Sequence, residues 1–160
     1  MVAKDLRQSC ALVIVAEGFD ESETIPILSL LRQAGLCVKS VGLTSGLVGS
    51  AHGVWIMPDL TLAELEQLNS TISVSVIILP DGRQSLARLE ADPRVHRLLR
   101  QVVAQRGRIV TSREGLRVPR AAALWGSESQ EVDSERVTVL LREPEQSPEI
   151  FVQNLIRILK

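Results

Sequence analysis

Short apolar segments alternate along the chain with segments whose apolar residues recur every three or four positions. Residues 10–16 form a continuous apolar run, residues 74–79 are apolar apart from Ser75, and residues 36–43 contain further valines and leucines. Such runs are typical of strands that helices cover on both faces. Between the first two strands, apolar positions from Ile25 to Leu31 follow a helical period, and Gly35 is expected to end that helix. This alternation predicts βαβ units and a mainly parallel sheet.

The rest of the pattern predicts a hairpin followed by more strands and helices. Residues 47–50 and 54–57 are the expected arms of the hairpin. Thr61 and Glu64 have the spacing of a capping box, which favours a short helix starting there. The valines and leucines of residues 94–105 fall on one helical face. We also expect strands at residues 108–111 and 136–141, and helices at residues 115–124 and 148–159.

The composition is that of an ordinary globular domain. The chain has 160 residues, 45% hydrophobic and 23% charged, with a formal net charge of −1, so we expect one domain over residues 1–160. No apolar run approaches the roughly 20 residues that a membrane span needs. The first ten residues lack the apolar centre of a signal peptide, which favours a cytoplasmic protein. Aromatic residues are only 2%, which argues against binding single-stranded nucleic acid by base stacking.

Basic residues concentrate in the middle of the chain. Residues 81–120 contain ten arginines and four acidic residues, whereas the segments on both sides are net negative. The arginines could contact an anionic partner. Alternatively they cover the solvent-facing sides of two helices, which is the more ordinary origin of such a pattern.

Cysteine and histidine are too few and too scattered to predict a metal or disulfide site. Cys10 and Cys37 are not in C-x-x-C spacing and have no histidine cluster near them in the sequence, so we expect two buried, inert thiols. His52 falls in the hairpin turn and His96 lies off the apolar stripe of its helix, so both are expected at the surface. No metal or cofactor is therefore predicted.

Five short motifs give the chain a resemblance to a known family. In chain order they are the first strand with its acidic E-x-E turn at residues 11–24, R-x-A-G at 32–35, a P-D segment at 58–64, L-P-D-G at 79–82, and R-x-P-x-x-S-x-E at 142–149. In this order they resemble motifs of the ThiJ/PfpI superfamily, relatives of the class I glutamine amidotransferases. The resemblance covers nearly the whole chain and implies a flavodoxin-like α/β fold, a three-layer sandwich around a mainly parallel sheet.

The chain departs from this family where the catalytic residues belong. In the family, a strand like residues 107–112 leads into an elbow that carries a cysteine and then Ala-Gly, whereas here Arg113, Glu114 and Gly115 follow. A guanidinium stays protonated and has only donors, so Arg113 cannot attack a carbonyl carbon. The family's histidine has no counterpart, because residues 125–127 lead almost directly towards the last strand. Ser112 belongs to no G-x-S-x-G pattern, so we do not expect a nucleophile there.

The resemblance implies a degenerate pocket at the carboxyl ends of the strands, where open parallel sheets place ligands. Glu23 corresponds to the carboxylate that contacts the family's cysteine, and Gly82 to a backbone N–H of the oxyanion type. We hypothesise that Glu23 and Arg113 form a partly buried ion pair across this pocket; the alternative is that Arg113 faces water. The predicted pocket residues are Glu23, Asp81, Gly82, Ser112, Arg113, Glu114 and Gly115.

These departures predict a catalytically inactive domain that binds a partner protein or a small anion. A homodimer is expected from the resemblance, and the apolar hairpin and first helix are the surfaces that could form it. The alternative is a hydrolase, glyoxalase or deglycase of the family type, with Glu23 as general base and Arg113 holding an oxyanion. A nucleic-acid surface on the arginine-rich stretch is a third, weaker hypothesis, because no helix-turn-helix pattern accompanies it.

Overall fold

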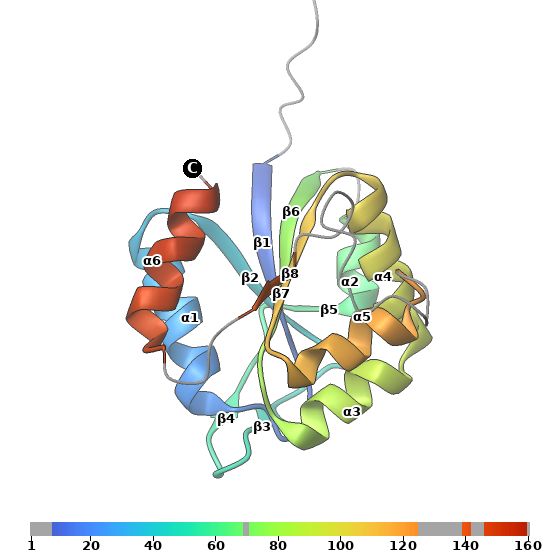
Figure 1. The fold of residues 1–160 in the computed structure, drawn as a ribbon. Helices are drawn as coiled ribbons and strands as arrows, with labels where there is room; N and C mark the ends of the chain where they lie inside the picture. The colour runs from blue at the N-terminus through green and yellow to red at the C-terminus, as the bar shows by residue number, and fades with distance from the viewer. Residues whose placement is uncertain (1–7, 69–70, 125–138, 142–145, 160) are drawn as a thin grey trace, which may run out of the picture.

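One parallel sheet organises the molecule. The computed structural model describes residues 8–68, 71–124, 139–141 and 146–159. Within these ranges, six strands form a parallel sheet in the order β5-β2-β1-β6-β7-β8 (Figure 1). The strands are β1 (Gln8–Val15), β2 (Cys37–Gly42), β5 (Leu60–Thr61), β6 (Ile72–Leu79), β7 (Arg108–Thr111) and β8 (Val139–Leu141).

Helices cover both faces of this sheet, as the predicted three-layer architecture requires. In Figure 1, α1 and α6 lie on one side, and α2, α3, α4 and α5 lie on the other. The helices are α1 (Glu21–Gln33), α2 (Leu62–Gln67), α3 (Arg83–Ala91), α4 (Pro93–Ala104), α5 (Arg117–Ala121) and α6 (Pro148–Leu159), with the 3-10 turn η1 (Glu114–Leu116) before α5. No helix in the described part of the chain is both long and apolar enough to cross a membrane.

The side chains of β1 alternate between two hydrophobic cores. Leu12 and Ile14 belong to a cluster that includes Leu89 and Leu99 from the helices of one layer. Val13 and Val15 belong to a second cluster with residues of α1 and α6, among them Ile27, Leu31, Phe151 and Leu155. Because successive side chains of a strand point to opposite faces, an uninterrupted apolar run is what a strand between two helical layers needs. The first strand is therefore explained by its two-sided burial.

Two parts of the second half differ from the sequence-based prediction. Helix α3 (Arg83–Ala91) is not predicted, because among its buried residues only Leu86 and Leu89 are strongly apolar and two positions do not establish a period. The helix expected at residues 115–124 is shorter, divided into η1 and α5 (Arg117–Ala121). Of the strand expected at residues 136–141, β8 (Val139–Leu141) is present, and residues 136–138 lie outside the described ranges.

The predicted hairpin is confirmed and is attached to the end of β1. Its arms β3 (Val48–Gly49) and β4 (Trp55–Ile56) pair antiparallel. The N–H of Gly18 donates to the carbonyl of Gly49 over 2.8 Å, and the N–H of Ala51 donates to the carbonyl of Phe19 over 2.8 Å. These bonds hold the hairpin beside the carboxyl end of the sheet.

The P-D segment anchors the chain between the hairpin and α2. The carboxylate of Asp59 accepts hydrogen bonds from the Ser40 N–H (2.7 Å) and hydroxyl (2.9 Å) and from the Arg32 guanidinium (2.6 Å). Partial burial raises the pKa of Asp59, but the bonds from Ser40 and the charge of Arg32 outweigh it, and the pKa lies below its usual value. Asp59 thus ties this loop to α1 and β2.

The two cysteines form a disulfide, so the prediction of two separate thiols is wrong. Cys10 and Cys37 are register partners on the adjacent parallel strands β1 and β2, with a Cα–Cα distance of 4.7 Å. Neighbouring strands lie about 4.8 Å apart, which is within the Cα separation that a disulfide spans. The two cysteines are 27 residues apart in the sequence, and this spacing does not indicate that they are paired. The expected position of each cysteine at the start of one of the first two strands was the signal that could have revealed it.

The capping box of α2 gives a test of this local structure. The Thr61 hydroxyl accepts the N–H of Glu64 over 3.1 Å, and the Glu64 carboxylate accepts the N–H of Thr61 over 2.7 Å. We expect Thr61→Ala to lower the free energy of unfolding by about 1 kcal/mol, because an N-terminal N–H of α2 loses its acceptor. Thr44→Ala, at an exposed turn, is the matched control and should change it by less than about 0.5 kcal/mol. Urea denaturation measures both, and equal losses would contradict the assignment.

Candidate pocket at the carboxyl edge of the sheet

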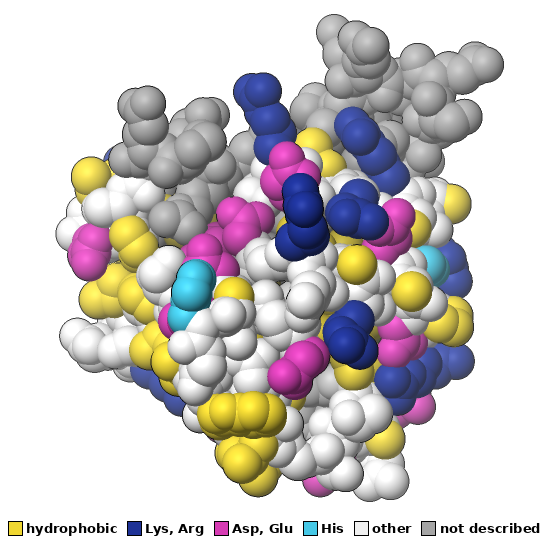
Figure 2. All heavy atoms as spheres, turned by 90° about the horizontal axis from the view of Figure 1, so that it is seen from below, with side chains coloured by type: hydrophobic (Ala, Val, Ile, Leu, Met, Phe, Trp, Pro, Cys, Tyr) yellow, Lys and Arg dark blue, Asp and Glu magenta, His cyan; other side chains and the backbone are white. Residues whose placement is uncertain are grey.

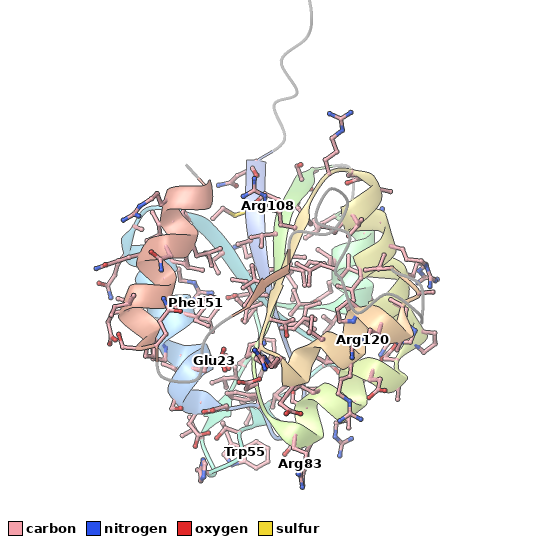
Figure 3. The ribbon with its side chains drawn as sticks, viewed as in Figure 1. Glu23, Trp55, Arg83, Arg108, Arg120 and Phe151 are labelled. Carbon is pink, nitrogen blue, oxygen red and sulfur yellow. A yellow bond between two sulfur atoms is a disulfide. The ribbon has the colours of Figure 1, made fainter. Side chains whose placement is uncertain are left out.

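Three turns meet where β1, β6 and β7 end. They are residues 16–20 after β1, residues 80–82 after β6 and residues 112–113 after β7. Figure 3 shows Glu23 of α1 near these strand ends, on the side of the sheet opposite to Arg120 of α5. This is the edge at which the sequence predicts a ligand pocket.

Glu23 is a buried carboxylate that holds two of these turns together. It lies in the first turn of α1, whose N-cap Asp20 accepts the N–H of Ser22. Its side chain is 3% exposed, and Oε2 accepts the backbone N–H of Asp81 over 3.0 Å. The carbonyl of Asp81 in turn accepts the N–H of Asp20 over 2.8 Å. The acidic turn and the L-P-D-G turn are therefore joined by two hydrogen bonds to the backbone of one residue, Asp81.

Gly82 lets these two turns approach closely. Its φ is +130°, a region that other residues rarely adopt. A Cβ atom at this position would lie 2.4 Å from the carbonyl oxygen of Gly18 and 2.8 Å from the Cα of Phe19. Only glycine fits this contact, which explains the last residue of the L-P-D-G turn.

Ser112 and Asp81 bond to each other across the ends of β6 and β7. The Ser112 hydroxyl donates to Oδ1 of Asp81, and its oxygen accepts the N–H of Gly115 over 3.1 Å. Ser112 is 7% exposed. Sequence reasoning placed both residues in the pocket and did not foresee this bond. The Asp81 carboxylate thus supplies the acceptor for the Ser112 hydroxyl.

Arg113 does not pair with Glu23, so the hypothesised ion pair is not formed. Both residues are described by the structure, and no ion pair joins them; Arg113 is exposed whereas Glu23 is buried. The backbone of Arg113 has φ −56° and ψ −44°, an ordinary helical conformation. It lacks the sharp, strained turn that presents a nucleophile in an enzyme elbow. Glu114 is exposed as well. Of the seven predicted residues, the structure joins Glu23, Asp81, Ser112 and Gly115 by hydrogen bonds and packs Gly82 against the turn after β1.

Neither histidine joins this group. His52 is at the tip of the hairpin, with its side chain 83% exposed and its Nδ1 3.1 Å from Oε1 of Glu21. The pKa of the Glu21 carboxyl lies below its usual value, chiefly because the carboxylate accepts a hydrogen bond from its own backbone N–H. Burial acts in the opposite direction, and the contact with His52 lowers the pKa further. His96 of α4 lies with Nε2 2.6 Å from the carbonyl of Glu90. Among the described residues, no group of three or more histidine, cysteine, aspartate or glutamate side chains is arranged to hold a metal ion.

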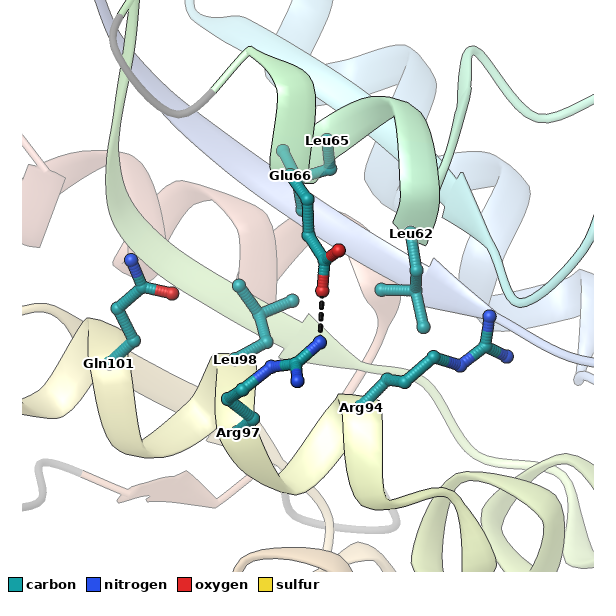
Figure 4. A pocket seen from close by; sticks show the side chains of 7 residues that line it. All are labelled: Leu62, Leu65, Glu66, Arg94, Arg97, Leu98 and Gln101. Carbon is teal, nitrogen blue, oxygen red and sulfur yellow. Dashed lines mark hydrogen bonds and ion pairs between the residues drawn. The ribbon is translucent and has the colours of Figure 1, made fainter.

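A separate hollow lies between α2 and α4 (Figure 4). Glu66 and Arg97, which line it, form an ion pair with each other, and Arg94 pairs with Asp92. It is lined by Leu62, Leu65, Glu66, Arg94, Arg97, Leu98 and Gln101. This hollow contains none of the predicted pocket residues.

The arginine-rich stretch does not form one basic surface at the carboxyl edge. Figure 2 views this edge and shows dark blue basic side chains mixed with magenta acidic ones. Arg94 pairs with Asp92, and Arg117 pairs with Glu90. This arrangement favours the alternative of solvated helix faces.

Double-mutant cycles test which side chains in the pocket are coupled. We expect Asp81→Ala and Ser112→Ala to be non-additive by about 1 kcal/mol or more in the free energy of unfolding, because each removes the same hydrogen bond to a carboxylate. Glu23→Ala and Arg113→Ala should add within about 0.5 kcal/mol, because the two side chains do not touch. Urea denaturation of the single and double variants gives both numbers. Coupling confined to Glu23 and Arg113 would contradict the geometry.

Sequence comparisons with known proteins find a family model and curated relatives that match part of the chain. The family model DJ-1/PfpI matches residues 9–115. The chain is 32% identical over 100 residues to Parkinson disease protein 7 homolog of Danio rerio, covering 62% of this chain and 51% of that protein. It is 38% identical over 73 residues to Protein dj-1beta of Drosophila melanogaster, covering 45% and 37%. The matched segments thus span about half, or less, of these relatives' lengths.

Solved structures extend the likeness in fold to nearly the whole chain. Oxidized DJ-1 of Toxoplasma gondii superposes with a TM-score of 0.76 at 20% identity, covering 94% of this chain and 90% of that one. DJ-1beta of Drosophila melanogaster gives 0.71 at 24% identity, covering 94% and 88%. Because the family model matches well over half of the chain and the folds superpose, the chain belongs to the DJ-1/PfpI family.

Proposed function

We propose that this chain is a catalytically inactive DJ-1/PfpI domain that acts by binding, with a second copy of itself as its first partner. The observation that carries the proposal is Arg113 at the elbow after β7, exposed and in helical conformation. Covalent catalysis needs a nucleophile with a base in hydrogen-bond reach. A guanidinium supplies neither.

The other polar groups of the pocket support the same conclusion. The Ser112 hydroxyl is bonded to Asp81 and to the Gly115 N–H, and it is nearly buried. Oε2 of Glu23 already accepts the N–H of Asp81. These groups satisfy one another, whereas catalytic groups must be oriented towards a reacting atom. A cytoplasmic location remains a prediction.

An enzymatic alternative would use Glu23 as a general base and Arg113 as an oxyanion contact. It requires both side chains to face one substrate, and the burial of Glu23 beside an exposed Arg113 argues against this arrangement. The exposed guanidinium is better suited to a small anion that binds without being transformed.

Activity assays separate these two functions. We expect the wild-type chain and Glu23→Gln to turn over methylglyoxal and p-nitrophenyl acetate at the same background rate, because no nucleophile is available. A DJ-1/PfpI protein with its cysteine intact serves as the positive control. Turnover above background that disappears in Glu23→Gln would establish the enzymatic alternative. Thermal melts with inorganic phosphate, for the wild type and Arg113→Gln, test the small anion: a stabilisation lost in the variant would show binding at the elbow.

The hairpin and α1 present the surface that supports a homodimer. Trp55 and Met57 are 59% and 64% exposed, and Ile25 on α1 is 38% exposed. Figure 3 shows the Trp55 side chain at the lower edge of the molecule, by the hairpin. A groove between α1 and this hairpin is lined by Ile25, Leu28, Ser29, Arg32, Gln33, Ser40, Ile56, Met57 and Asp59.

A second copy fits this surface by symmetry. In a twofold dimer the same patch meets itself, so apolar side chains face apolar side chains. The ion pair between Arg32 and Asp59 lies at the groove. It gives the apolar patch a polar rim of the kind that protein interfaces have.

An exposed methionine gives the test of the dimer. We expect Met57→Asp to weaken self-association at least tenfold, because two carboxylates would be buried against an apolar patch. Ala104→Asp, exposed on α4 in the layer across the sheet, is the control and should leave association unchanged. Sedimentation equilibrium measures the dissociation constant of each. A monomeric wild type, or equal weakening by both variants, would contradict the proposed interface.

A further inference from the structure

We infer that the Cys10–Cys37 disulfide is a reversible redox modification site, in which Cys37 is the sulfur that small thiols attack. The pair lies at the amino ends of β1 and β2, at the edge of the sheet opposite the pocket. The inference therefore does not depend on the proposed function.

The strand ladder aligns the two sulfurs independently of their bond. From Cys10 and Cys37, the pairing of β1 with β2 continues in register to Val15 and Gly42. On its other side, β1 is held by β6, where the Ser75 hydroxyl donates to the Cys10 carbonyl over 3.2 Å beside a shift in register. After reduction these backbone contacts still hold the cysteines as neighbours. Bond formation is then an intramolecular step between groups already in place.

The two cysteine residues differ in their exposure to solvent. Cys10 is 1% exposed, whereas Cys37 is only partly buried. Residues paired in parallel register point to the same face, and Leu12 and Val41, two and four positions further along the strands on that face, belong to the core beneath α2 to α5. A thiolate must reach a sulfur atom to break the bond. Cys37 offers this access, and Cys10 is shielded by the core.

The reaction is a pair of thiol–disulfide exchanges. The thiolate of a small thiol attacks Sγ of Cys37, the bond between the cysteines breaks, and the Cys10 sulfur leaves as a thiolate that takes up a proton. A second small thiolate then attacks the small thiol's sulfur in this mixed disulfide, and the Cys37 thiolate leaves and is protonated. Two small thiols become one small disulfide, and the protein disulfide becomes a dithiol. The same small disulfide reverses both steps.

Reduction removes a constraint from the β1–α1–β2 unit. The bond closes a loop of 27 residues that contains α1 with Glu23. A cross-link of this length restricts the unfolded chain, so its reduction is expected to lower the Tm by about 10 °C in a domain of this size. The folded state should survive, because both cores and the strand ladder remain.

Alkylation followed by intact-mass measurement tests the inference. The native protein purified without reductant should take up no N-ethylmaleimide. After millimolar dithiothreitol in native buffer it should take up one equivalent at least tenfold faster than the second. Cys10→Ser should keep the fast reaction, and Cys37→Ser only the slow one. Oxidised glutathione should then restore the unreactive, higher-melting form of the wild type.

Three outcomes would overturn it. They are two reactive thiols before any reduction, a bond that opens only in denaturant, or a faster reaction at Cys10 than at Cys37. The Cys10→Ser/Cys37→Ser protein is the control for the melting experiment, because dithiothreitol should not change its Tm. If that double variant does not fold, the two single variants still give the order of reactivity.

Discussion

The backbone and side chain of Asp81 hold the carboxyl edge of this domain together. Its N–H donates to Glu23, its carbonyl accepts from Asp20, and its carboxylate accepts from Ser112. These contacts join the turns that follow β1, β6 and β7. The turns after β1 and β6 can come this close because Gly82, which lies against Gly18, has no side chain. The Asp81 carboxylate therefore gives this edge an internal partner for the Ser112 hydroxyl. A pocket whose polar groups bond to one another keeps its shape without a thiol or a substrate.

Much of the fold could be predicted from the sequence because several of its longer elements are strongly patterned. The buried run of β1 and the one-sided helix α4 follow directly from the alternation of apolar and polar residues. Helix α3 could not be predicted in this way. Leu86 and Leu89 are its two residues in the hydrophobic core, which is too few to show a helical period, and its N-cap residue, Gly82, makes no side-chain hydrogen bond. Its position is set by the turn before it and by the helices it packs against. Propensity and period alone do not contain that information.

The sequence predicts which residues lie near one another at the carboxyl edge, but it does not predict which of their side chains form hydrogen bonds or ion pairs. Topology brings the ends of β1, β6 and β7 to one edge, so Glu23, Asp81 and Ser112 were expected near one another. Which of these residues form hydrogen bonds or ion pairs depends on differences of about an ångström in the distances between their polar atoms, and on how deeply each side chain is buried. Glu23 is buried and Arg113 is exposed, so their opposite charges do not meet. The cysteines show the same limit, because their pairing follows from strand register and not from their spacing in the sequence.

The first βαβ unit is fixed at both ends of the sheet by different chemistry. At the amino edge a covalent bond joins Cys10 to Cys37, and at the carboxyl edge Glu23 accepts the Asp81 N–H. Between them, the two cores cover both faces of β1. The hydrogen bonds at the pocket form only in the folded protein, whereas the disulfide also constrains the unfolded chain. A change in redox state is therefore expected to alter the free energy that separates the folded and unfolded states, while the hydrogen bonds of Glu23, Asp81 and Ser112, at the opposite edge of the sheet, do not involve the disulfide.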